Sequence, residues 1–172
     1  SMIQIDMGNA TIAFDYLQQQ LVISQKQGDE DMEATAYHDL GWLLRQNDRQ
    51  IPEAISYFER ALKMFSKGRH PGGAEITLIN LAESYLKLND YQKARLYAYK
   101  AIDAAKEGRA WGTHAYQVLG SIDLAQGNPQ QALDYLEKSL DIAKKREVGR
   151  EPMIFLQMGK CLMQLSRPQE AL

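Results

Sequence analysis

The chain has little of the composition that marks cross-linked, membrane-spanning or nucleic-acid-binding proteins. Its 172 residues include one cysteine, Cys161, which excludes an internal disulfide. No apolar run approaches the roughly 20 residues that cross a bilayer. Lysine and arginine total 20 against 22 acidic residues, and the net charge of −2 gives no attraction to nucleic acid or anionic lipid. We therefore expect a cytoplasmic protein with no nucleic-acid partner and no membrane partner.

The sequence also lacks the motifs of catalysis and metal binding. The three histidines, His38, His70 and His114, occur without HExxH spacing and without a Cys/His cluster. No glycine-rich phosphate loop and no nucleophile constellation is present. Cys161 lies on an apolar helical pattern two residues after Gly159, which is typical of a packed small side chain. We expect no enzyme, with no catalytic residue, no metal and no cofactor.

What the chain does contain is a repeat. A Leu/Met–small pair recurs at intervals of 41, 38 and 39 residues, at Leu40-Gly41, Leu81-Ala82, Leu119-Gly120 and Met158-Gly159. Two further small positions follow each pair, the first at Ala54, Ala94, Ala132 and Ala171, and the second at Ala61, Ala101 and Ser139. Two helices approach closely only where a side chain is small, so these positions predict helices that pack in pairs. The fold class is all-α, a stack of antiparallel helix pairs.

Turn signals between the helical patterns predict the boundaries of a single array. Residues 1–9 are expected to be a tag remnant and a flexible N-terminus, and residues 10–172 the array. Within it we expect an N-terminal helix of a partial repeat over 10–30, repeats over 31–68, 74–107 and 111–147, and a truncated repeat over 152–172. Gly68, Pro71, Gly72 and Gly73 are expected to form the most evident loop.

The repeated positions resemble those of the tetratricopeptide repeat (TPR) family, from about Ala34 to Leu172. Units of that family are usually about 34 residues long, so units near 40 are similar to the long-repeat subgroup of kinesin light chains, spindle-orientation adaptors and many bacterial regulators. The family tryptophan is replaced by Tyr37, Leu78, Tyr116 and Phe155. The resemblance implies a right-handed α-solenoid, the TPR superhelix, whose first helices line a concave groove.

The repeat register selects the residues expected to line that groove without an intramolecular partner. They are His38, Asp39, Trp42, Arg45, Ile79, Asn80, Glu83, Lys87, His114, Gln117, Ser121, Gln157 and Lys160. Asn80 is the best single candidate, since an asparagine both donates to and accepts from a ligand backbone. The sequence leaves open whether Trp42 faces the groove or the core, and a merely solvated polar face remains the alternative for the whole set.

Chaperone-binding members of the family hold a terminal carboxylate with lysine, asparagine and arginine side chains. The corresponding positions here are His38, Trp42, Asn80, His114 and Val118, and only the asparagine matches. Without those cations a C-terminal carboxylate is poorly compensated. We therefore expect no chaperone ligand of that class.

Two functions follow as expectations. The first is a non-enzymatic interaction module that binds a peptide or protein partner in the groove. The second is a regulatory or dimerisation region of a larger signalling protein, such as a bacterial sensor kinase, cyclase or transcription regulator. A helix that breaks off at Ala171-Leu172 leaves the last unit uncovered. The sequence thus suggests a longer natural protein, and a fragment that either self-associates through its C-terminal end or leaves its last segment loosely held.

Overall fold

The computed structural model describes residues 7–66, 71–105, 111–146 and 149–166, and these residues are helical with short turns and no strand. The elements follow the chain as α1 (Met7–Gln27), α2 (Glu30–Leu44), a 3₁₀ turn (Asp48–Gln50), α3 (Ile51–Phe65), α4 (Pro71–Lys87), α5 (Tyr91–Ala104), α6 (Trp111–Ala125), α7 (Pro129–Arg146) and α8 (Glu151–Leu165). The all-α prediction is confirmed.

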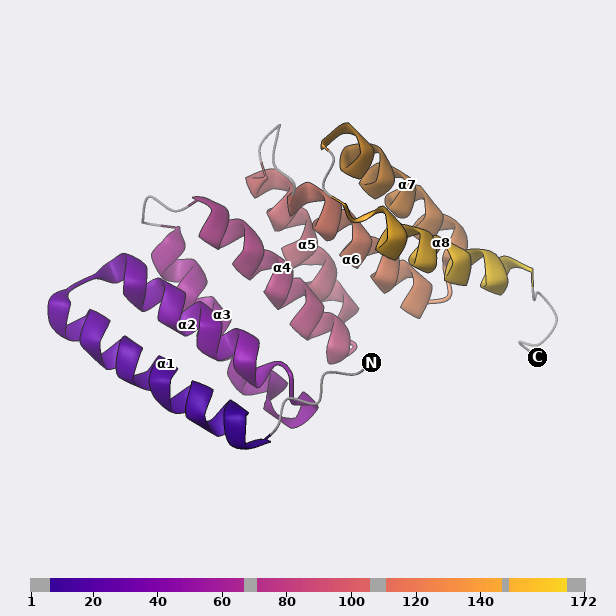
Figure 1. Cartoon of the computed structure of the whole chain (residues 1–172). Coiled ribbons are helices and arrows are strands. Elements are labelled where there is room, and N and C mark those ends of the chain that lie inside the picture. The colour runs from indigo at the N-terminus through magenta and orange to yellow at the C-terminus, as the bar shows by residue number, and fades with distance from the viewer. Residues whose placement is uncertain (1–6, 67–70, 106–110, 147–148, 167–172) are drawn as a thin grey trace.

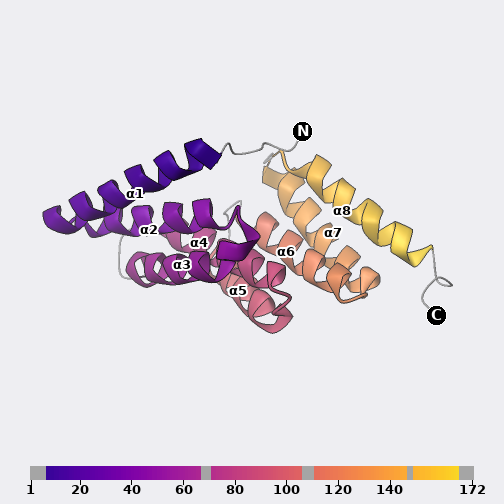
Figure 2. The ribbon, with the colours of Figure 1, turned by 90° about the horizontal axis from the view of Figure 1, so that it is seen from below.

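The helices stack as antiparallel pairs, α2 with α3, α4 with α5 and α6 with α7, while α1 and α8 stand at the two ends (Figure 1). Seen from below, the row of helices is bent, and α3 and α5 lie on the side opposite α1 and α8 (Figure 2). The architecture is the right-handed α-solenoid that the resemblance to the TPR family implies.

Small residues allow the two helices of a pair to touch. A Cβ added to Gly41 would lie 2.8 Å from a ring carbon of Phe58, and one added to Gly120 would lie 3.0 Å from Cγ of Leu136. The repeated small residues carry no exposed surface: Ala54, Ala61, Ala82, Ala94, Ala101, Ala132 and Ser139. Leu40, Leu81 and Leu119 are likewise buried among them. Fully burying a side chain such as Phe58 contributes about 1.5–3 kcal/mol.

The last small positions differ from the others. A Cβ added to Gly159 would meet no atom within 4 Å. Ala171 lies outside the described residues. Gly159 therefore lacks the close contact seen at Gly41, while Met158 packs partly buried against the cluster that holds Ile154 and Cys161.

Two expected boundaries shift. Helix α1 begins at Met7, inside the segment expected to be flexible. Helix α4 begins at Pro71, so Pro71, Gly72 and Gly73 belong to its first turn and not to the expected loop, whereas Gly68 lies outside the described residues. The reason is packing: a Cβ at Gly73 would lie 2.7 Å from the Phe65 ring, so this helix start approaches the preceding helix as only glycine permits.

Aspartate side chains cap the N-termini of α2 and α5, after the short turns that precede these helices. Asp29 accepts a hydrogen bond from the Met32 backbone N–H at 3.0 Å, and Asp90 accepts one from Lys93 at 3.1 Å. These carboxylates satisfy N–H groups of the first helical turn, which have no partner within the helix. Their negative charge also interacts favourably with the positive end of the helix dipole. Asn89 adopts a φ of 58°, a left-handed conformation that asparagine tolerates better than most residues.

Candidate partner-binding groove

The first helices of successive pairs lie next to one another, and polar side chains bond directly between them. We call the surface formed by α2, α4, α6 and α8 along this row the inner face. Bonds cross it from α2 to α4, from α4 to α6 and from α6 to α8. The residues expected to line a groove therefore come together on one side of the stack.

Glu83 on α4 is the centre of a charged triad. Its Oε2 accepts from Nη1 of Arg45, at the end of α2, and its Oε1 pairs with Nε2 of His114 on α6 at 2.8 Å. Burial opposes ionisation of this carboxyl, yet the His114 hydrogen bond and the Arg45 charge lower its pKa to about 2. Glu83 is thus a carboxylate at neutral pH and joins three units.

A second chain of polar groups runs through His38. Nδ2 of Asn80 lies 2.9 Å from His38 Nε2, and His38 Nδ1 lies 3.2 Å from Oδ1 of Asp39. Because an amide NH₂ group only donates, Nε2 accepts in this arrangement, and the protonated Nδ1 donates a hydrogen bond to Asp39. Asn80 is almost wholly buried.

The last two first helices are joined by side-chain amides. Gln157 Nε2 on α8 donates to Ser121 Oγ on α6 at 2.9 Å. Arg150, which precedes α8, donates to Oε1 of the buried Gln117 at 3.5 Å. Between the first two units, Lys87 on α4 donates to Oδ1 of Asp48 at 2.9 Å, and Asp48 lies in the 3₁₀ turn that follows α2. These contacts continue the same row of polar pairs.

Two expectations are therefore corrected. Ile79 has no exposed surface and belongs to the hydrophobic core, so it does not line a groove. The expectation that the groove side chains lack intramolecular partners is also wrong, because neighbouring first helices pack closely enough for their polar side chains to meet. Complementary side chains about one repeat apart, such as Arg45 with Glu83 and Glu83 with His114, were the sequence signal that could have revealed this.

Other members of the predicted set remain accessible. Trp42 is 47% exposed and therefore does not belong to the core. The Asp39 side chain is 45% exposed. Lys87 and Lys160 are exposed, while Ser121 and Gln157 are half-buried. A partner on the inner face would meet these groups first.

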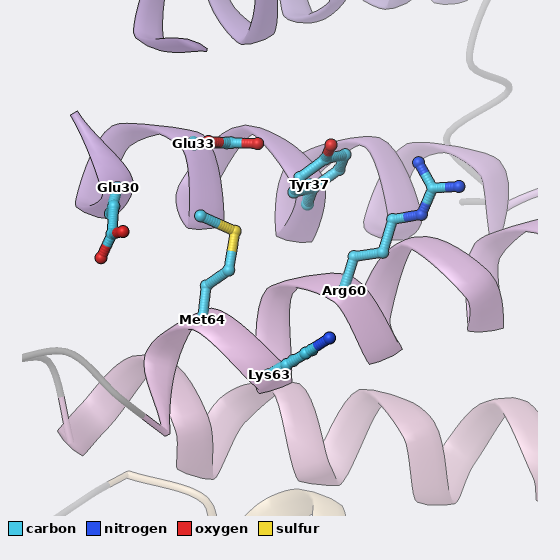
Figure 3. A pocket seen from close by; sticks show the side chains of 6 residues that line it. All are labelled: Glu30, Glu33, Tyr37, Arg60, Lys63 and Met64. Atoms are coloured by element: carbon cyan, nitrogen blue, oxygen red, sulfur yellow. The ribbon is translucent and has the colours of Figure 1, made fainter. Parts of the chain in front are cut away.

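A pocket of about 360 Å³ on another side of α2 was not expected from the sequence (Figure 3). Its acidic wall, Glu30 and Glu33, comes from α2, and its basic wall, Arg60 and Lys63, from α3. The Arg60 guanidinium lies 5.6 Å from the centre of the Tyr37 ring. Nine positions separate Glu33 from Trp42, about two and a half helical turns, so the pocket faces away from the inner face.

The described ranges contain neither a metal site nor a membrane span. No group of three or more His, Cys, Asp or Glu side chains there is placed to hold a metal ion. No helix in the same ranges is long and apolar enough to cross a bilayer.

Comparison with known proteins places this geometry in a family. The model of the tetratricopeptide repeat family matches residues 2–67, 48–107 and 73–145. A putative kinesin light chain of Podosopora anserina with nearly identical TPR-like repeats is 20% identical, with a TM-score of 0.71, over 95% of this chain and 82% of that one. A point-substituted form of it is 19% identical over the same shares, with a TM-score of 0.73. At this identity the likeness shows the fold alone. No curated protein matches the chain. Because the family model covers most of the sequence, the chain belongs to the tetratricopeptide repeat family, whose members serve as protein-interaction scaffolds.

Proposed function

We propose that the protein is a non-enzymatic interaction module that binds a peptide or protein partner in a groove on its inner face. The observation that carries the proposal is the row of polar pairs between α2, α4 and α6, centred on Glu83. These pairs hold the side chains in place before a partner arrives. Less side-chain freedom is then lost on binding, which favours affinity.

The proposal assigns different roles to the buried and the exposed members of the row. Glu83 and Asn80 fix the surface, since each already binds side chains of its own chain. Trp42, Lys87 and Lys160 meet the partner, since they are exposed. Exposed aromatic side chains are enriched among the residues that dominate binding energy, which makes Trp42 the main anchor.

The same contacts bear on the class of partner. His38 and Asn80 bind each other, and Val118 is buried, so these positions offer no cationic clamp for a chain terminus. The proposed partner is therefore not a chaperone C-terminal carboxylate. Neither nucleic acid nor a membrane is proposed as a partner, and the proposed compartment is the cytoplasm.

Selection of peptides from a random display library tests the proposal. Clones that bind the wild-type protein are measured again on Trp42→Ala and on Ser121→Trp, which fills the inner face. Leu96→Ala on α5 serves as control, since Leu96 is exposed and lies on a second helix of a pair. We expect at least about a tenfold loss for the inner-face variants and none for the control. Clones that bind all variants equally would refute the groove.

A second candidate, a regulatory region that works by self-association, is favoured by α8. Six large apolar side chains of this helix are exposed: Met153, Phe155, Leu156, Leu162, Met163 and Leu165. Exposed apolar patches of this kind often mark association surfaces. Light scattering over a concentration series tests it, with Leu162→Glu expected to give a monomer and Leu96→Glu to leave association unchanged. A monomeric wild-type protein at every concentration would remove this candidate.

A further inference from the structure

Trp42 and Asp39 form an exposed pair of an indole and a carboxylate on α2. Their side chains are 47% and 45% exposed. Residues three apart on a helix are neighbours, with Cβ atoms about 5–6 Å apart. One ligand group can therefore touch both side chains.

The repeat explains why this pair is open. The positions equivalent to Asp39 and Trp42 in the next unit are Asn80 and Glu83, which bind His38 and Arg45 of the unit before them. Asp39 and Trp42 face the corresponding direction from α2, and α1 packs instead on the side of α2 that holds Leu40. The pair thus lies at the edge of the inner face.

The carboxylate of Asp39 is already oriented. His38 Nδ1 lies 3.2 Å from Oδ1, and His38 is held in turn by Asn80 at 2.9 Å. Only Oδ1 of this carboxylate takes part in the contacts that the structure describes. Asp39 is therefore an oriented acceptor on a side chain that is 45% exposed, and its Oδ2 makes none of the described contacts.

Basic side chains of the neighbouring first helices are engaged elsewhere. Arg45 binds Glu83, and Lys87 binds Asp48. Helix α2 itself carries acidic residues in its first turn and at Asp39, so its charge is negative despite Arg45, which follows the helix. A cation at the Trp42–Asp39 pair would meet a complementary charge.

We propose that Trp42 and Asp39 bind an arginine or lysine side chain of the partner segment, a specificity that rests on the proposed groove. The cation stands over the indole face, which attracts it through the ring quadrupole. Its N–H groups donate to Oδ2 of Asp39 in a charge-assisted hydrogen bond. The inner face thus selects segments that place a basic residue at α2.

A tripeptide titration tests this subsite directly. The probe is acetyl-Ala-Arg-Ala-amide, with the Glu and Gln tripeptides as references, and backbone amide shifts of isotope-labelled protein report the site. We expect millimolar binding of the Arg probe, with shifts concentrated in α2, and no saturable shift with the Glu probe. Asp39→Asn is expected to raise Kd about threefold or more, Trp42→Leu about fivefold or more, and Asp39→Glu to keep most of the affinity.

The matched control is Asp134→Asn, which makes the same charge change at an exposed position of α7 and is expected to leave Kd unchanged. Equal losses for Asp39→Asn and Asp134→Asn, or equal binding of the Arg and Glu probes, would overturn the subsite. If the Arg probe leaves α2 unshifted while library peptides still depend on Ser121, the subsite is wrong and the groove stands. If the Arg probe leaves α2 unshifted and library peptides also do not depend on Ser121, both the subsite and the groove are wrong.

Discussion

At the scale of single residues, Glu83 has the greatest influence on the inner face. It sits between a guanidinium and an imidazole from two other units, and both interactions favour its ionised form. A carboxylate held in this way contributes to stability only while it is charged. Its removal leaves Arg45, whose Nε is already buried without a partner, with no counter-charge in the triad.

We predict that Glu83→Gln destabilises the protein at neutral pH and that the deficit disappears in acid. Hydrogen bonds to charged groups contribute about 1.5–3 kcal/mol. The Glu83 pKa falls from 4.5 to about 2 on folding, so its contribution is full above pH 4.5 and is lost as the pH falls toward 2. Urea unfolding from pH 7 to pH 2.5 measures the gap between the variant and the wild type.

Glu137→Gln is the control for that titration, since Glu137 is exposed on α7. Its stability should follow the wild type at every pH. A Glu83→Gln deficit that stays constant down to pH 2.5 would contradict the assigned role of the carboxylate.

The repeated glycines give a second residue-scale prediction with its control inside the chain. Gly120→Ala places a methyl group 3.0 Å from Leu136, and overpacking of this kind costs about 1–3 kcal/mol. Gly159→Ala meets no neighbour, and alanine is favoured over glycine in a helix by up to about 1 kcal/mol. Thermal unfolding should therefore show a lower Tm for the first variant and a higher Tm for the second. Two lowered Tm values would show that α8 meets a neighbour at Gly159.

These residues also mark what the sequence could and could not predict. The small residue at Gly120 and its contact partner belong to one repeat, so periodicity alone identified the packing. Whether Ile79 or Asn80 is open depends on how closely two successive first helices approach, a distance that no local pattern contains. In the sequence, Arg45 and His114 are complementary to Glu83 and lie about one repeat before and after it. The repeat register alone does not say which of these side chains bind each other.

At the scale of elements, the two terminal helices α1 and α8 have fewer helix neighbours in the described stack than α4 has. Helix α8 packs on α7 and α6, while α4 packs on α3, α5 and α6. Its buried contacts rest on Ile154 and Cys161, and most of its other large apolar side chains are exposed. The beginning of α4 shows the opposite case: Gly72 and Gly73 are typical of a loop, but both lie in the helix, and Gly73 approaches the Phe65 ring closely.

We predict that α8 opens without the rest of the protein. Helices with few buried contacts have low local opening free energies, so α8 amides should exchange with solvent faster than α4 amides by at least about tenfold. The thiol of Cys161, which is fully buried, should react with a thiol reagent at the rate of this opening. Hydrogen-exchange mass spectrometry and thiol labelling measure the two rates. Equal protection of α8 and α4 would show that the stack unfolds as one unit.

At the scale of the whole molecule, the polar pairs change how the repeats depend on one another. A solenoid in which each unit touches only its neighbours has a stability that is close to a sum of unit and interface contributions. Here each oxygen of Glu83 forms a hydrogen bond with a side chain of a neighbouring unit. The first and third units are therefore linked through one carboxylate. The curvature of the inner face then depends on three units together.

A double-mutant cycle on Arg45 and His114 tests that dependence. The two residues lie on the first and third units, and within the described ranges the hydrogen bonds join them through Glu83 alone, so simple neighbour stacking predicts additive effects. We predict instead a coupling free energy of about 0.5–1.5 kcal/mol between Arg45→Met and His114→Phe, within the range for residues of one network. The cycle Lys63→Met with His114→Phe is the control, since Lys63 lies on α3 and lines the pocket on the far side of α2. If the coupling between Arg45→Met and His114→Phe vanishes in a Glu83→Gln background, the Glu83 carboxylate transmits it. Additivity in all cycles would mean that the three units are stabilised independently.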